Sequence, residues 1–231
     1  MTTIAARLQA VRSRIDAAAM TAGRPPADIR LIAVSKTFPP AAIAEAHAAG
    51  QVAFGENYLQ EAVGKMATLS DLRLEWHYIG PIQSNKTRQI AEQFHWVHGV
   101  DRLKTAERLS FSRPAILPPL QICIQVNVSG EESKSGVRPD GVLSLAKAVS
   151  PLTGIRLRGL MAIPEPTPDI GLQRSRFRLL RQLRDEIVSR GVALDSLSMG
   201  MSDDLEAAIA EGATLVRVGR AIFGERLPHS G

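Results

Sequence analysis

Short apolar runs and helical patterns alternate along this chain from one end to the other. Runs of branched apolar residues, stopped by glycine, proline or polar residues, predict eight strands at residues 31–35, 52–54, 74–79, 95–98, 120–127, 155–161, 194–198 and 214–218. Apolar residues three and four apart predict helices at residues 4–19, 40–49, 57–69, 83–93, 101–111, 139–149, 168–190 and 203–211, with a short helix after the last strand.

This alternation of strands and helices predicts an α/β protein with a parallel sheet. Eight strand–helix units in a chain of 231 residues favour a single (β/α)8 barrel of the TIM type with an extra N-terminal helix. An open, doubly wound sheet is the alternative, since periodicity does not distinguish the two. No linker or change of composition interrupts the chain, so residues 1–231 are predicted to form one domain.

Composition narrows the class of protein. The single cysteine, Cys123, lies in an apolar run, so it is predicted to be a core residue in a reducing compartment such as the cytoplasm. The net charge is +5, but the densest group of arginines, between Arg174 and Arg184, follows helical spacing like a solvated face. We therefore expect no binding to nucleic acid. No apolar stretch approaches the ~20 residues of a membrane helix.

Lys36 follows the first buried strand directly. In parallel α/β folds, ligands bind at the carboxyl ends of the strands. A lysine at that position is partly desolvated, which favours an uncharged amine that can attack a carbonyl. The alternative is that Lys36 only ends the strand and extends into water.

The loops after the last two strands resemble phosphate sites. Ser202 precedes Asp203 and Asp204 at a predicted helix start, and Gly219 opens the final short helix. Helix starts offer unpaired N–H groups to an anion. Alternatively, Ser202 only caps its helix and Gly219 only forms a turn. An amine and a phosphate site at one mouth fit a phosphorylated aldehyde, of which pyridoxal 5′-phosphate is the common cofactor. The histidines show no ligand spacing, and we expect no metal.

Seven segments occur in one order: IAVSK at 32–36, FGENYLQE at 54–61, WHYIGPIQSNK at 76–86, SKSG at 133–136, RGLMAIP at 158–164, SMGMSDD at 198–204 and RVGRAIFG at 217–224. In these segments the chain resembles the pyridoxal phosphate homeostasis protein family, also called the YggS/PROSC-type family. The resemblance implies a barrel like the N-terminal domain of alanine racemase. It also implies intracellular cofactor homeostasis, with pyridoxal 5′-phosphate held as a Schiff base on Lys36.

The resemblance also implies a set of cofactor-binding residues: Lys36, Asn57, His77, Met161, Ser202, Arg217, Gly219 and Arg220. In that set, Ser202 and the backbone of Gly219 and Arg220 bind the phosphate. Arg217 faces the pyridine nitrogen. Lys134, in the SKSG segment, matches a lysine near the mouth of the site.

Arg217 bears on whether such a protein is an enzyme. A guanidinium only donates hydrogen bonds, so a ring nitrogen facing it stays unprotonated and the ring is a weak electron sink. Racemases of this fold take a second base from an added β domain, and we expect none after Gly224. These points favour a monomeric, non-catalytic protein that binds the cofactor and delivers it to apo pyridoxal phosphate enzymes. A weak amino-acid racemase, or a binding module without cofactor, is the alternative.

Overall fold

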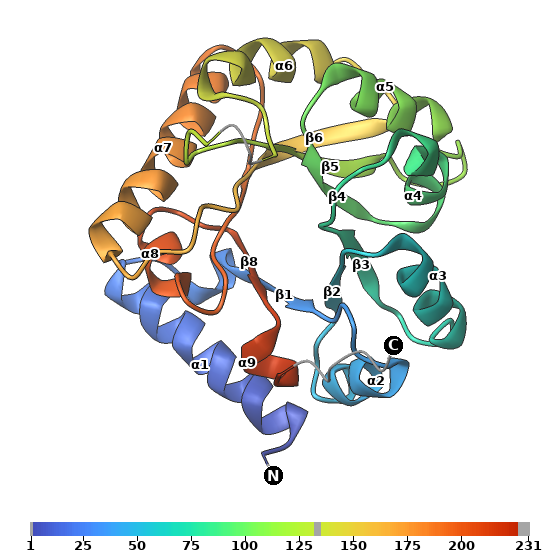
Figure 1. The fold of residues 1–231 in the computed structure, drawn as a ribbon, viewed down its shortest axis with the longest axis vertical. Coiled ribbons are helices and arrows are strands. Elements are labelled where there is room, and N and C mark those ends of the chain that lie inside the picture. Colours follow the sequence, from blue (N-terminus) through green and yellow to red (C-terminus); the bar gives the residue numbers. More distant parts are fainter. Residues whose placement is uncertain (1, 132–134, 226–231) are drawn as a thin grey trace.

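A computed structural model describes residues 2–131 and 135–225 of the protein. In that part of the chain, eight parallel strands form one closed barrel in chain order, and helices surround it (Figure 1). The strands are β1 (Arg30–Val34), β2 (Ala53–Glu56), β3 (Glu75–Tyr78), β4 (Trp96–Val100), β5 (Leu120–Gln125), β6 (Ile155–Met161), β7 (Ser196–Ser198) and β8 (Leu215–Val218). The α-helices are α1 (Ile4–Thr21), α2 (Pro40–Ala48), α3 (Leu59–Thr68), α4 (Thr87–Gln93), α5 (Leu103–Ser112), α6 (Val142–Val149), α7 (Ile170–Ser189), α8 (Leu205–Ala210) and α9 (Arg220–Phe223).

The closure of the sheet confirms the predicted barrel and excludes the open sheet. The last strand, β8, pairs in parallel with β1, in a register that aligns Ile32 with Arg217 and Ala33 with Val218. Each predicted strand is present, with ends shifted by one or two residues. Helices α3 and α8 start two residues later than predicted, at Leu59 and Leu205, because short polar segments separate them from β2 and β7.

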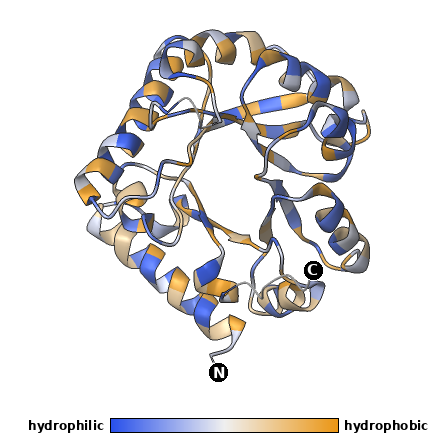
Figure 2. Ribbon diagram, in the orientation of Figure 1, coloured by the Kyte–Doolittle hydropathy of each residue, from blue (hydrophilic) through white to orange (hydrophobic). Residues whose placement is uncertain are grey.

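Two layers of apolar side chains stabilise the barrel. The larger layer lies between the strands and the helices, whose mixed polar and apolar surfaces are visible in Figure 2. A smaller cluster fills the barrel interior, and its members are Ile32, Ala53, Trp96, Cys123, Met161 and Leu215. Burial of Cys123 in that cluster raises the pKa of its thiol to about 12, so the thiol stays protonated and acts as a core side chain, as predicted.

The N-terminal helix α1 packs on the outside of the barrel beside α8, α9 and α2 (Figure 1). Ile4, Leu8, Val11 and Ile15 form its buried face, as their spacing predicts. Arg7 adds a polar link, because its Nε donates to the backbone oxygen of Ile222 at 2.6 Å. The helix thus supports the segment that follows β8. No helix within residues 2–131 and 135–225 is both long and apolar enough to cross a bilayer.

The arginine-rich helix α7 is more than a solvated face. Arg174, Arg178 and Arg181 place guanidinium nitrogens 2.9, 2.9 and 3.3 Å from the carboxylate of Glu211, which is buried at the end of α8. Burial alone would raise the pKa of Glu211, but the arginines outweigh it and lower the pKa. The sequence-based interpretation of these arginines was therefore incomplete: half-exposed, they tie α7 to α8.

Candidate functional site

The carboxyl ends of the strands bring most of the predicted site residues to one end of the barrel. These residues are Lys36 after β1, Asn57 after β2, Met161 at the end of β6, Ser202 after β7, Arg217 near the end of β8, and Gly219 and Arg220 after β8. They come from segments up to 184 residues apart, between positions 36 and 220 of the sequence. The closed sheet is what makes them neighbours, since β1 and β8 lie side by side.

The segment that carries Lys36 is joined to the segment after β8. The ring of Phe38 stacks on the ring of Phe223 in α9, with centroids 5.1 Å apart. Thr37, which lies between Lys36 and Phe38 in the sequence, has φ 69°, in the left-handed region that β-branched residues rarely adopt. Lys36 therefore sits in a tight, defined turn rather than in a loose loop.

The two predicted phosphate loops follow β7 and β8, and the loop after β8 lies next to the segment that carries Lys36. Gly219 precedes α9, and a Cβ there would lie 3.0 Å from the Val34 oxygen, so the close approach of β1 and β8 favours glycine. Among residues 2–131 and 135–225, no acceptor is found for the backbone N–H groups of Ser202, Gly219 or Arg220. Unpaired backbone N–H groups at a turn or at the start of a helix are suited to an anion.

The alternative that Ser202 only caps α8 is wrong. The cap position belongs to Asp204, and α8 begins at Leu205. Asp204 Oδ1 accepts a hydrogen bond from the Met201 backbone N–H at 2.6 Å, which closes a turn around Ser202. The Ser202 hydroxyl therefore does not cap α8 and can serve another role.

Arg217 is buried with its guanidinium inside the barrel. Its Nη1 donates to Ser198 Oγ at 2.6 Å, and its Nη2 donates to the Ala162 oxygen at 2.9 Å. These bonds use two of the five N–H donors of the group. Burial lowers the pKa of Arg217 to about 10, which Asp204 partly opposes, so the side chain is still a cation at neutral pH.

A chain of hydrogen bonds continues from Arg217 through the barrel interior. Ser198 Oγ lies 2.8 Å from His98 Nδ1, His98 Nε2 lies 3.0 Å from His77 Nδ1, and His77 Nε2 lies 2.7 Å from Glu75 Oε1. Burial lowers the pKa of both histidines, so both rings are neutral.

The groups at the two ends of this series of hydrogen bonds determine which ring nitrogens carry the protons. The Glu75 carboxylate can only accept, so His77 donates from Nε2 and accepts at Nδ1. His98 must then donate from Nε2 and accept the Ser198 hydroxyl proton at Nδ1. All donors therefore point from Arg217 toward Glu75, which holds the guanidinium in one orientation.

Both ring nitrogens of His77 are engaged by protein groups, and His98 and Ser198 connect this ring to Arg217. The placement of His77 among the cofactor-binding residues stays a prediction. His98, Ser198 and Glu75 were missed by the sequence analysis. The sequence carried one signal for Glu75. Side chains two residues apart in a strand lie on the same side of the sheet, and Glu75 and His77 are two residues apart in β3.

Asn57 directly follows β2, and Met161 is the last residue of β6. The Asn57 Oδ1 atom is buried and has no hydrogen-bond partner among the described residues. A buried, unpartnered oxygen is costly unless a ligand satisfies it. Met161 is fully buried in the interior cluster below this end of the barrel. Lys134 lies outside the described residues.

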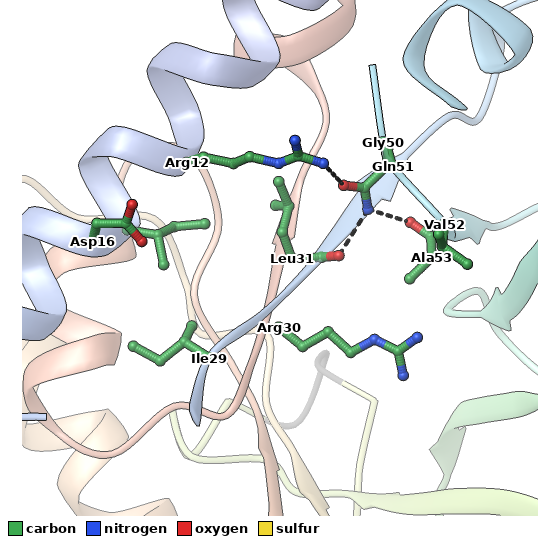
Figure 3. Close-up of a pocket in the computed structure, with 10 residues that line it drawn as sticks. Arg12, Asp16, Ile29, Arg30, Leu31, Gly50, Gln51, Val52 and Ala53 are labelled. Atoms are coloured by element: carbon green, nitrogen blue, oxygen red, sulfur yellow. Dashed lines mark hydrogen bonds between the residues drawn. The ribbon is translucent and has the colours of Figure 1, made fainter. Parts of the chain in front are cut away.

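A cavity at the other end of the barrel is built differently. Its volume is about 530 Å³, and its polar lining includes Arg12 and Gln51 from α1 and the start of β2 (Figure 3). Gln51 Nε2 donates to the Leu31 and Ala53 oxygens, and Gln51 Oε1 accepts from Arg12. These groups satisfy one another, so this cavity is a structural feature of the strand starts. Within the described part of the chain, no group of three or more His, Cys, Asp or Glu residues could hold a metal.

A closed parallel barrel with a lysine directly after its first strand is the architecture of the alanine racemase N-terminal domain class. The sequence model of that family, "Alanine racemase, N-terminal domain", matches residues 6–227. More narrowly, the chain belongs to the pyridoxal phosphate homeostasis protein family. It is 62% identical to the "Pyridoxal phosphate homeostasis protein" of Pseudomonas aeruginosa, over 98% of this chain and 97% of that one.

Relatives of known structure agree with this membership. PipY of Synechococcus elongatus, whose structure was solved with PLP bound, is 40% identical over 96% of this chain and 100% of its own, with a TM-score of 0.86. Alanine racemase of Corynebacterium glutamicum shares only the fold, at 16% identity over 97% of this chain and 63% of its own, with a TM-score of 0.69. The close relatives are thus named for homeostasis, while racemases are distant in sequence.

Proposed function

We propose that this protein binds pyridoxal 5′-phosphate covalently on Lys36 and serves in homeostasis of the cofactor. The observation that carries the proposal is the meeting of Lys36, the unpaired N–H groups around Ser202 and Gly219, and buried Arg217 at one barrel mouth. This set fits the group: an amine for an aldehyde, N–H donors for a phosphate, and a guanidinium for a ring nitrogen. The names of the close relatives support the same assignment.

Each residue has a distinct task in this proposal. The uncharged Lys36 amine adds to the aldehyde carbon, water leaves, and a C=N bond joins lysine and cofactor. Ser202 Oγ and the backbone N–H groups of Gly219 and Arg220 hold the phosphate. Asn57 offers its unpartnered oxygen to a polar group on the ring. Met161 supports the ring from below, and His77 acts through Arg217.

The proposal is that of a carrier without catalytic activity of its own. A bound pyridoxal group can supply electron withdrawal, but that requires a protonated ring nitrogen for full effect. Here every donor in the series of hydrogen bonds points from Arg217 toward Glu75, and the Arg217 guanidinium itself only donates, so it cannot supply an acceptor for a ring N–H. Burial of Cys123, the single cysteine, supports a reducing compartment such as the cytoplasm, and we propose that the carrier works there as a monomer.

The test of this function is transfer of the cofactor. Protein loaded with pyridoxal 5′-phosphate is mixed with an apo pyridoxal phosphate enzyme, and recovery of that enzyme's activity is timed. We expect the activity to recover without prior accumulation of free cofactor in solution. A scavenger of free aldehyde tests this, because it removes cofactor that is released into solution. Recovery that disappears fully with the scavenger contradicts delivery, and formation of D-alanine from L-alanine at a robust rate contradicts the absence of catalysis.

Ser202→Ala is expected to weaken retention of the cofactor. Loss of one hydrogen bond to a charged phosphate costs about 1.5–3 kcal/mol, which corresponds to a dissociation constant raised roughly 10- to 150-fold. Equilibrium dialysis of the loaded protein measures it. Ser70→Ala, at an exposed position after α3, is the matched control and should bind like the wild type. Equal affinity in Ser202→Ala and wild type would remove Ser202 from the phosphate site.

A further inference from the structure

A buried group of charges lies behind Lys36, on the side of the barrel wall that faces α3. Lys65 comes from the inner face of α3 and is only 5% exposed. Its Nζ lies 2.7 Å from Glu56 Oε1, at the end of β2, and it also bonds Glu61 Oε1 one turn earlier in α3. We refer to Lys65, Glu56 and Glu61 as the Lys65 cluster.

The Lys65 cluster contacts the chain immediately before Lys36. Lys65 Nζ donates to the backbone oxygen of Ser35 at 2.8 Å. The Ser35 hydroxyl donates to Glu56 Oε1 at 2.6 Å. Both the main chain and the side chain of Ser35 are therefore fixed by charged groups.

The same cluster contacts the chain immediately after Lys36. Glu61 Oε1 accepts the backbone N–H of Thr37 at 2.6 Å. Thr37 is the residue with φ 69°, a conformation that costs a β-branched residue of the order of 1–2 kcal/mol. The turn at residues 35–37 is thus an unfavourable backbone shape, and this hydrogen bond helps to stabilise it.

The Lys65 cluster is an energetically costly way to pack α3 against β2, because it buries charged groups. The Glu56 side chain is fully buried, and its Oε2 has no hydrogen-bond partner in the described part of the chain. Burial raises the pKa of Glu56, and the charge and hydrogen bond of Lys65 oppose this only in part. Since apolar residues of similar volume often pack such a place as well or better, the geometry of the turn is the better reason for these charges.

We propose that Lys65 and Glu61 are positioning residues for Lys36: they hold Ser35 and Thr37 and thereby direct the Lys36 amine into the barrel mouth. The inference rests on the proposed function, because it concerns the amine that receives the aldehyde. Neither residue touches the cofactor in this proposal. Their effect passes through the two backbone neighbours of Lys36.

Glu61 offers the sharper test, because its side chain is 29% exposed and Lys65 keeps Ser35 and Glu56 as partners when Glu61 is replaced. Glu61→Ala removes the acceptor of the Thr37 N–H, whereas Glu61→Gln keeps an oxygen at that place without the charge. We expect C=N formation with added pyridoxal 5′-phosphate to slow about tenfold in Glu61→Ala and to stay within about threefold of wild type in Glu61→Gln. Glu92→Ala, which removes the exposed partner of Arg88 on α4, should behave like wild type.

Amide hydrogen exchange of Thr37 in the cofactor-free protein provides an independent readout. We expect exchange at Thr37 to be at least about tenfold faster in Glu61→Ala than in Glu61→Gln or wild type. If wild type forms no C=N bond, the proposed function fails, and the exchange experiment still tests the cluster. If wild type forms it but Glu61→Ala matches wild type in both measurements, the positioning role is wrong.

Lys65→Met should slow C=N formation further than Glu61→Ala does. If the Lys65→Met variant does not fold, the comparison of Glu61→Ala with Glu61→Gln decides the question.

Discussion

Lys36→Ala is expected to abolish covalent binding of pyridoxal 5′-phosphate altogether. The wild-type protein should be yellow, and borohydride reduction should attach the cofactor to the peptide that contains Lys36. Among the described residues, Lys65 lies near Lys36 but is not expected to replace it, because it is buried and donates to Ser35, Glu56 and Glu61. The visible absorbance of the C=N bond should therefore be absent, at any cofactor concentration that saturates wild type.

The control for this experiment is another lysine of the same chain. Lys104 is exposed on α5 and is not one of the residues of the proposed site. Lys104→Ala should keep the absorbance and the label on the Lys36 peptide. A yellow Lys36→Ala protein, with the label on a different lysine, would contradict the assignment of Lys36. A colourless wild type that cannot be reconstituted would contradict cofactor binding itself.

Gly159→Ala is expected to destabilise the barrel strongly. Gly159 lies in β6 opposite Ser196 of β7, and a Cβ at this position would lie 1.8 Å from the Ser196 backbone oxygen. Both strands belong to a closed sheet, so neither can move away without disturbing its other neighbour. We expect a loss of about 3 kcal/mol or more in the free energy of unfolding, measured by chemical denaturation.

Gly64→Ala is expected to stabilise the protein, in contrast to Gly159→Ala. Gly64 lies in α3, and nothing lies within 4 Å of a Cβ built there. The substitution should raise the free energy of unfolding by about 0.5–1 kcal/mol, since glycine is a poor helix former. An unfolding midpoint for Gly159→Ala equal to that of wild type would show that β6 and β7 are farther apart in solution than in this structure.

Much of the fold was predictable because it depends on local patterns. Buried parallel strands appear as continuous apolar runs, and the helices keep the 3.6-residue period of a single buried face. Ile4, Leu8, Val11 and Ile15 predicted α1 in this way. Helix starts were less accurate, because the turn closed by Asp204 in front of α8 depends on one side-chain hydrogen bond that the apolar pattern does not record.

The site was predictable only in part. Lys36, Ser202 and Gly219 could be identified because each follows a predicted strand, and parallel strands end at one face. The sequence did not indicate that the two nitrogens of His77 bond to Glu75 and His98. Hydrogen bonds between residues on different strands depend on the stagger of the closed sheet, which no local pattern encodes.

The sequence by itself determined the class of fold and the lysine at the end of the first strand, and it predicted the phosphate-binding loops after the last two strands. These properties follow from the order and type of neighbouring residues. The tertiary structure alone decided that Lys65 and Glu61 reach both neighbours of Lys36, and that Arg217 connects through Ser198 to two buried histidines. The physical reason is that burial and barrel closure create these contacts: a lysine in a helix pattern looks solvent-exposed until the strand behind it is known.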